Sequence, residues 1–203
     1  MNKKSNKQIA KEILNREIDA LKRTTRLLDV KFEKACEAIL FNKGKVITLG
    51  VGKSSFIAMK MAATLSSTGT AALFLHPVDA LHGDIGVIRK NDVVIIYSNS
   101  GETQEVIELL PILKLLKCYI IAITGNLSSS LAQYSNISLD ASVTREACPH
   151  NLAPTSSIIC ALALSDALAL AVSVQNNFSI KDFAKTHPGG AIGKRLMVTV
   201  SSI

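Results

Sequence analysis

The fold is decided by residues 93–103, VVIIYSNSGET. Residues 93–96 are a short apolar run, which is typical of a parallel strand buried on both faces. After Thr103, apolar side chains recur at helical spacing as far as Leu113. The hexapeptide 98–103 is therefore expected to join the carboxyl end of a buried strand to the amino end of a helix.

This hexapeptide is rich in groups that bind an anion. Backbone N–H groups at a helix start point outward, and the helix dipole favours negative charge there. Ser98, Ser100 and Thr103 add hydroxyl donors, and Asn99 adds an amide. Asn99 or Ser100 would also serve as an ordinary helix cap. Three hydroxyls, an amide and a glycine exceed what a cap needs, so we favour a phosphate-binding cradle.

Similar apolar runs occur along the rest of the chain. Strands are expected at residues 46–49, 71–75, 119–123 and 137–139, with helices between them. Such alternation predicts an α/β fold with a doubly wound, mostly parallel sheet and helices on both faces. Ligands bind these sheets outside the carboxyl ends of the strands. The strand ends at residues 50–54, 98–103 and 124–125 are therefore candidates for one shared edge.

Residues 158–174 are apolar enough to suggest a membrane span. Asp166 lies in the middle of this run, and a charge at that depth of a bilayer would be costly. We therefore expect a helix buried against the sheet and no membrane partner.

Composition limits the class of protein. The chain of 203 residues is 48% hydrophobic, which is enough for one α/β domain with a sizeable core. It has no Trp and 4% aromatic residues, which argues against a stacking platform for single-stranded nucleic acid. The four cysteines form no CxxC pair and no apolar leader follows Met1. Buried thiols in a reducing cytoplasm are therefore expected.

The net charge of +7 is concentrated at the amino end. Residues 1–45 carry 12 of the 23 Lys and Arg residues but 6 of the 16 Asp and Glu residues. Apolar residues recur there at helical intervals. Residues 1–43 are therefore expected to form one long amphipathic helix, packed on the domain of residues 44–203 or on a partner subunit. A nucleic-acid arm is the alternative that we favour less.

A glycine turn with a lysine follows the first strand. Residues 50–54, GVGKS, are similar to the end of a P-loop, but Ile47 stands where that motif requires its first glycine. A dinucleotide fingerprint also fails, because Ser55 occupies its third glycine position. A glycine turn with a cation at Lys53, opposite the cradle, fits a small phosphorylated ligand better than a nucleotide.

The reactive inventory consists of Lys53, His82, Glu105, Glu146 and His187. His82 and His187 are each flanked by glycine-containing turns, and either one taken alone fits a loop histidine bonded to backbone. Glu105 follows the cradle and also fits a surface acid at a helix start. Glu146 precedes a helix start at residues 154–157, where capping accounts for the hydroxyls but not for the carboxylate. The sequence has no metal-ligand spacing and no GxSxG elbow, so neither a zinc site nor a serine hydrolase is expected.

Several segments together resemble the sugar isomerase (SIS) domain of D-arabinose 5-phosphate isomerases, in order from about residue 45 to 195. They are residues 50–54 (GVGKS), 98–103 (SNSGET), 145–149 (REACP), 152–157 (LAPTSS) and 187–191 (HPGGA). The Ser-Gly cradle is common to SIS domains in general. The Lys53 turn, residues 82–84 and the segments of Glu146 and His187 are more specific to this isomerase.

The resemblance implies a flavodoxin-like three-layer fold and the interconversion of D-ribulose 5-phosphate and D-arabinose 5-phosphate through an enediol. This step leads toward 3-deoxy-D-manno-octulosonate (Kdo). The resemblance also implies no cofactor and a homotetramer with active sites shared between subunits. By the same resemblance, the five reactive residues match catalytic positions. The matched substrate and phosphate contacts are Gly52, Ser54, Ser98, Asn99, Ser100 and Thr103.

The sequence departs from the family pattern because members usually continue into paired CBS domains, whereas it stops at Ile203. This departure bears on regulation more than on chemistry. Two alternatives stay open: a non-catalytic SIS module that senses a sugar phosphate, as in some transcriptional regulators, and another isomerase such as a hexulose-phosphate isomerase. Regulators normally add a helix-turn-helix domain, which one long helix at the amino end does not match.

Overall fold

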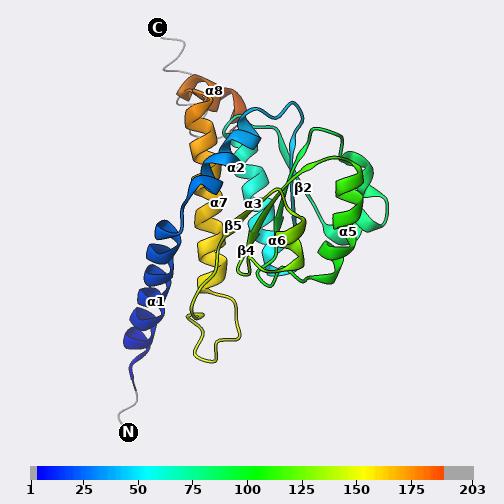
Figure 1. Cartoon of the computed structure of the whole chain (residues 1–203). Coiled ribbons are helices and arrows are strands. Elements are labelled where there is room, and N and C mark those ends of the chain that lie inside the picture. The colour runs from blue at the N-terminus through cyan, green and yellow to red at the C-terminus, as the bar shows by residue number, and fades with distance from the viewer. Residues whose placement is uncertain (1–3, 190–203) are drawn as a thin grey trace.

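Residues 4–189 are described by the computed structural model, and the apolar runs among them form one parallel sheet (Figure 1). Its strands are β1 (Val46–Gly50), β2 (Ala72–Leu75), β3 (Val93–Tyr97), β4 (Tyr119–Thr124) and β5 (Ile137–Asp140). The strand order is β2-β1-β3-β4-β5, and every pair is parallel. The predicted α/β fold with a doubly wound sheet is therefore confirmed.

Side chains of β3 enter two separate cores, because successive residues of a strand face opposite sides. Val93, Ile95 and Tyr97 pack in the core beneath α2 (Val30–Leu40), α3 (Lys53–Ser67) and α7 (Ser156–Gln175). Val94 and Ile96 pack in the core beneath α4 (Pro77–Leu81), α5 (Gln104–Leu115) and α6 (Ser130–Tyr134). Figure 1 shows α3 and α7 on one side of the sheet and α5 on the other. The sheet is thus the middle of three layers.

A crevice arises where the strand order reverses. The helix after β1, α3, covers one face of the sheet, and the helix after β3, α5, covers the other. These two strands are neighbours, with Gly50 level with Tyr97. Because the following helices diverge, the carboxyl ends of β1 and β3 open a crevice, which is where such folds bind ligands.

The amino end differs from the prediction of one long helix. It forms α1 (Asn6–Arg26) and α2, separated by residues 27–29. The break has a local cause, since the Asp29 side chain accepts a hydrogen bond from Lys31 N at 2.8 Å and caps α2. Both helices pack against α7, and Figure 1 shows α1 running beside it.

Helix α7 is long and apolar enough to cross a membrane by length and composition alone. In the fold it packs against α1, α2 and α3, and residues such as Cys160, Leu164, Leu168 and Val172 are buried. The predicted buried helix is confirmed. Its hydropathy is explained by contacts with three helices and the sheet.

Two short elements lie where only a connection was expected, between β2 and β3. Pro77 begins α4, and the preceding His76 accepts a hydrogen bond from Val78 N at 3.3 Å through Nδ1. A 3-10 helix (Asp84–Val87) follows. The last described element is α8 (Ile180–Thr186). Gly190 and Ala191, the end of the last segment in the family resemblance, lie outside the described residues.

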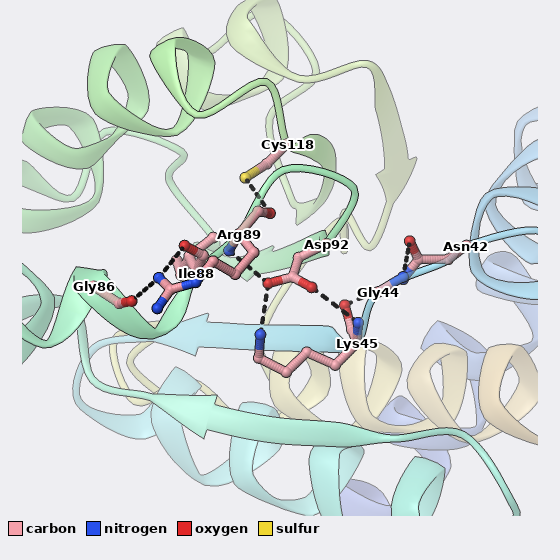
Figure 2. A network of polar contacts seen from close by, with 8 residues as sticks. All are labelled: Asn42, Gly44, Lys45, Gly86, Ile88, Arg89, Asp92 and Cys118. Carbon is pink, nitrogen blue, oxygen red and sulfur yellow. Dashed lines mark hydrogen bonds and ion pairs between the residues drawn. The ribbon is translucent and has the colours of Figure 1, made fainter.

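The amino ends of β1 and β3 are joined by the carboxylate of Asp92, which is 2% exposed (Figure 2). It accepts hydrogen bonds from Lys45 N at 2.9 Å, Lys45 Nζ at 2.7 Å and Arg89 N at 2.8 Å. Burial alone would raise the pKa of Asp92, but these hydrogen bonds and the Lys45 charge outweigh it and lower the pKa. This ion pair lies at the edge of the sheet opposite the crevice.

The four cysteines are free and differ in how deeply they are buried. Cys36, Cys118 and Cys160 are buried as expected, whereas Cys148 is half-buried. Burial raises the pKa of Cys36 and of Cys118 to about 11. These thiols therefore stay protonated and behave as small apolar side chains.

Candidate active site

A cavity of about 590 Å³ lies at the crevice between the carboxyl ends of the strands. This volume is within the usual range for a small-molecule site. The predicted site residues that line it are Lys53, Ser54, Ser98, Asn99, Ser100, Thr103 and Glu146. The structure thus brings the lysine turn, the hydroxyl cradle and one carboxylate from three distant segments into one cavity.

The cradle is a preformed turn between β3 and α5. Ser98 Oγ and Thr103 Oγ1 lie 2.8 Å apart, and Ser98 Oγ also accepts from Gly101 N at 3.0 Å. Thr103 is the N-cap residue of α5, yet within the described chain its side chain forms no capping hydrogen bond. The amino end of α5 therefore faces the cavity with its donors available to an anion. This geometry favours the cradle over the simple cap.

Gly101 is required by the shape of this turn. Its φ of 70° lies in the left-handed region. A Cβ at this position would lie 2.0 Å from Ser129 Oγ. Ser129 is fixed in turn, because it begins α6 and its hydroxyl donates to Asn126 O at 2.7 Å. The cradle is thus packed against the start of the neighbouring helix.

Lys53 is exposed and occupies the first position of α3, after the N-cap Gly52 with φ of 59°. A cation at a helix amino end opposes the dipole, at a cost of roughly 0.3–1 kcal/mol. Helix stability therefore does not account for Lys53. A bound anion would remove this conflict, which agrees with the predicted role of this turn.

Glu146 is 8% exposed, and donors from the start of α7 surround its carboxylate. Oε2 accepts from Thr155 N at 2.7 Å, Thr155 Oγ1 at 3.2 Å and Ser157 N at 3.2 Å. Oε1 accepts from Ser157 Oγ. The expectation that hydroxyls of residues 154–157 cap the helix is therefore wrong: the Glu146 carboxylate caps it, and the Thr155 and Ser157 hydroxyls donate to Glu146.

These contacts control the charge of Glu146. Burial acts to raise the pKa of the carboxyl group, but the hydrogen bonds from Ser157 and Thr155 outweigh burial and lower the pKa. Glu146 is consequently a carboxylate at neutral pH, ready to accept a proton. A lowered pKa also makes it a weaker base than an unperturbed glutamate.

The other predicted residues are not among the cavity-lining residues of the described chain. Gly52 precedes Lys53, and Glu105 lies half-buried in the first turn of α5. His82 is exposed at the carboxyl end of α4. His187 lies near the opposite end of α3 from Lys53, as the following contacts show.

His187 is held at the far end of α3. Its ring stacks on Phe183 at a centroid distance of 3.9 Å, and Nδ1 lies 3.0 Å from Phe183 O. The adjoining Thr186 donates to Ser67 O, at the carboxyl end of α3, at 3.1 Å. Lys53 is at the amino end of this 15-residue helix, so the two ends are about 20 Å apart. One chain does not bring His187 to its own cavity.

Sequence reasoning missed several cavity residues. Arg145 also lines the cavity, and its Nη2 donates to Pro149 O at 3.0 Å. Asn151 holds the Glu146 segment, since its Oδ1 accepts from Glu146 N at 2.7 Å. Tyr97 lies below, with its hydroxyl 2.8 Å from Ser165 Oγ, and burial raises its pKa. The sequence signals for Asn151 and Arg145 were an Asn in a loop and an Arg beside a candidate acid. Neither signal is specific to a binding site.

A comparison with protein families decides the relationship. The model of the SIS domain family matches residues 39–171, which is more than half of the chain. The chain belongs to the SIS family. The match spans β1 to most of α7, so this SIS domain includes the whole sheet and the cavity described above.

Individual relatives are similar over nearly all of this SIS domain protein. It is 52% identical over 197 residues to the arabinose 5-phosphate isomerase KdsD of Francisella tularensis strain SCHU S4, which covers 96% of this chain and 60% of that one. It is 45% identical over 196 residues to KdsD of Escherichia coli K12, covering 97% and 60%. The chain thus spans about 60% of the length of these curated relatives.

A solved structure also matches the SIS domain closely. The structure of E. coli CFT073 c3406 in complex with arabinose 5-phosphate has a TM-score of 0.88 to this chain at 39% identity. The match covers 93% of this chain and 100% of that one. The likeness therefore extends from the sequence to the arrangement of the elements.

Proposed function

We propose that this protein is an aldose–ketose isomerase that interconverts D-ribulose 5-phosphate and D-arabinose 5-phosphate and so supplies Kdo biosynthesis. One observation carries the proposal: Lys53, the hydroxyl cradle and the Glu146 carboxylate converge in one cavity of about 590 Å³. The similarity to relatives named arabinose 5-phosphate isomerase, and to a structure in complex with arabinose 5-phosphate, supports the same substrate.

The cavity suggests how the substrate is oriented. The phosphate lies in the cradle, where Ser98, Ser100 and Thr103 and the amino end of α5 supply donors. The sugar carbons then extend across the cavity toward Lys53 and Glu146, both of which line it. This orientation uses the phosphate for binding and leaves the first two carbons near the reacting groups.

The proposed reaction moves one proton between neighbouring carbons. Glu146 removes a proton from C1 of the ketose, and the C2 oxygen takes up a proton, which gives the enediol. The O1 hydroxyl then loses its proton as the C1 carbonyl forms, and Glu146 returns its proton to C2 to give the aldose. Oε1 suits this role, since the described contacts leave it one hydrogen bond from Ser157 Oγ whereas Oε2 accepts three. Lys53 stabilises the developing negative charge on the C2 oxygen. A positioned general base contributes about 10²–10⁴-fold in rate.

The remaining candidates are assigned to substrate handling. His187 opens the furanose ring, and Glu105 and His82 orient hydroxyls or relay protons. Because His187 and His82 lie outside the cavity of their own chain, we assign them to the cavity of a neighbouring subunit. This arrangement fits a cytoplasmic homotetramer with shared active sites and no cofactor.

The direct test incubates the protein with D-ribulose 5-phosphate and follows the aldose by proton NMR. Conversion without added metal, and in the presence of EDTA, supports the proposal because the mechanism uses no metal. Tight binding of the sugar phosphate without turnover would instead identify a sensor module. Turnover of a hexulose phosphate in preference to the pentose would assign a different isomerase.

Two variants separate binding from chemistry. Glu146→Gln keeps the size of the side chain and removes the base, so kcat is expected to fall by about 10²–10⁴-fold with little change in KM. Ser100→Ala removes a cradle hydroxyl and is expected chiefly to raise KM. Glu108→Gln, on the exposed face of α5, is the matched control and should behave as the wild type. Near-normal turnover of Glu146→Gln would remove Glu146 from the base role.

A further inference from the structure

The segment that carries Glu146 is bound to α1 at two points. Arg23 donates from Nε to Ser142 O at 3.4 Å and from Nη2 to Ser142 Oγ at 3.0 Å. Arg16 donates from Nη1 to Ala147 O at 3.3 Å. Ser142 and Ala147 bracket the stretch in which Thr144, Arg145 and Glu146 line the cavity. Both ends of this stretch therefore depend on the amino-terminal helix.

The spacing of the two arginines suits this task. Residues seven apart in an α-helix lie on the same face, about 10 Å apart along the axis. Arg16 and Arg23 thus extend from one side of α1 toward the same segment. Helix α1 in turn packs along α7, whose first turn binds the Glu146 carboxylate.

The segment is also held from its other side. Asn151 Oδ1 accepts from Glu146 N at 2.7 Å, and Thr155 Oγ1 accepts from Ala147 N at 2.9 Å. Ala147 is fully buried. With the two arginines, backbone atoms before, at and after Glu146 are all fixed. This is the pattern expected where the position of a reacting group must be held to within a fraction of an ångström.

Guanidinium groups are better suited to these contacts than other cations. Arg23 uses two nitrogens of its planar fork on one residue, which a lysine ammonium does not reproduce. The acceptors are a hydroxyl and carbonyl oxygens, so the contacts fix geometry without forming an ion pair. Arg26, one turn farther along α1, forms no hydrogen bond through its side chain in the part of the chain that the structure describes.

We propose that Arg16 and Arg23 are positioning residues that use α1 as a strap to hold the Glu146 segment at the active cavity. The proposal rests on the proposed isomerase function of that cavity. A displacement of α1 is transmitted through the two guanidinium groups to the backbone on either side of Glu146. The amino-terminal helix is thereby part of the catalytic apparatus, although it contributes no reacting group.

The kinetic test compares four variants. Arg23→Ala and the double variant Arg16→Ala/Arg23→Ala are expected to lower kcat by up to about 10²-fold, the usual effect of a misplacement near 1 Å. KM is expected to stay within a few-fold, because none of the described residues of α1 lines the cavity. Arg23→Lys should restore part of the loss. Arg26→Ala removes the same charge from the same helix and should keep the wild-type kcat.

A second measurement does not depend on activity. Amide hydrogen exchange of residues 142–148 should become faster in Arg23→Ala and in the double variant, but not in Arg26→Ala. If the double variant does not fold, Ser142→Ala removes one Arg23 contact without changing α1 and should accelerate the same amides to a smaller extent. Unchanged exchange together with unchanged kcat in Arg23→Ala would overturn the strap. Absence of isomerisation by the wild type, with faster exchange in the variants, would overturn the proposed function and leave the strap standing.

Discussion

Donors from Thr155 and Ser157 surround the Glu146 carboxylate, and no arginine or lysine is needed to lower its pKa. Hydrogen bonds to the charged form have the same direction of effect as a nearby cation. An arginine or lysine paired with Glu146 would have its charge partly neutralised and would be less available to an anionic ligand. The helix start therefore keeps Glu146 ionised and leaves Lys53, which lines the same cavity, for the proposed ligand.

Gly101 allows a sharp residue-scale prediction. Gly101→Ala places a Cβ 2.0 Å from Ser129 Oγ at a φ of 70°. We expect a loss of about 2–3 kcal/mol in the free energy of unfolding, measured by urea denaturation, from left-handed strain and the shift of Ser129. The same variant should bind inorganic phosphate more weakly.

Gly86→Ala is the matched control for this substitution. Gly86 has open space where a Cβ would lie, and its φ is not in the left-handed region. The free energy of unfolding of Gly86→Ala should be unchanged or raised by up to about 1 kcal/mol, because alanine lowers the conformational entropy of the unfolded chain. Equal stabilities of the two variants would show that the cradle tolerates a side chain.

At the level of elements, Asp92 joins the starts of β1 and β3, so its charge bears on the stability of the sheet (Figure 2). Asp92→Asn keeps the shape but leaves Lys45 without its partner. We expect a loss of about 3 kcal/mol at neutral pH, the scale for breaking a buried charged pair. Chemical unfolding of both proteins across pH measures it.

The pH dependence of this loss has a definite sign. The pKa of Asp92 is lower in the folded protein than in the unfolded chain, so its stabilising contribution is present above the unfolded pKa of about 3.9. It disappears as the pH falls through the folded pKa. The gap between wild type and Asp92→Asn should therefore shrink on acidification. A constant gap for Asp92→Asn would contradict the linkage.

An element could be predicted from the sequence when neighbouring residues alone determine it. Residues 93–96 and 158–174 identify β3 and α7, because a predominantly apolar run indicates a buried strand when short and a buried helix when long. The break between α1 and α2 depends on one capping contact of Asp29. The sequence does not reveal this break, because apolar residues recur at helical spacing on both sides of it. Elements α4 and the 3-10 helix are too short for periodicity to reveal.

The candidate site was predictable to the same degree. The cradle and the Lys53 turn follow from strand-turn-helix patterns and from the rule for parallel sheets. The partners of Glu146 do not, since hydroxyls at a helix start usually cap it, and only the folded loop turns them toward a carboxylate. The location of His187 could not be predicted from neighbouring residues, because its distance from the cavity depends on how α8 packs on α3.

For the whole molecule, the distance of about 20 Å between His187 and Lys53 along α3 leads to a complementation experiment. Lys53→Ala and His187→Ala should each be inactive or nearly so. Mixed oligomers of the two should regain activity, up to about a quarter of wild type for a two-fold pair in which one shared site is intact. Activity of the co-expressed, mixed protein measures it.

The control mixes Lys53→Ala with Glu146→Gln, two changes within the same chain's cavity. This mixture should regain no activity, because every cavity carries one defect. Recovery in the control, or none in the Lys53→Ala and His187→Ala mixture, would contradict the sharing of active sites between subunits.

The helix start beneath Glu146 has an evolutionary consequence. A substitution at position 146 removes a helix cap and the proposed base in the same step, so the amount of folded protein and its catalytic rate decline together. Drift at Lys53 removes a cation that the α3 dipole disfavours, so a neutral replacement yields an inactive protein that folds at least as well. Of the two, Lys53 is the position at which a lineage would lose the proposed catalysis, and part of its affinity for an anionic ligand, while keeping an intact fold.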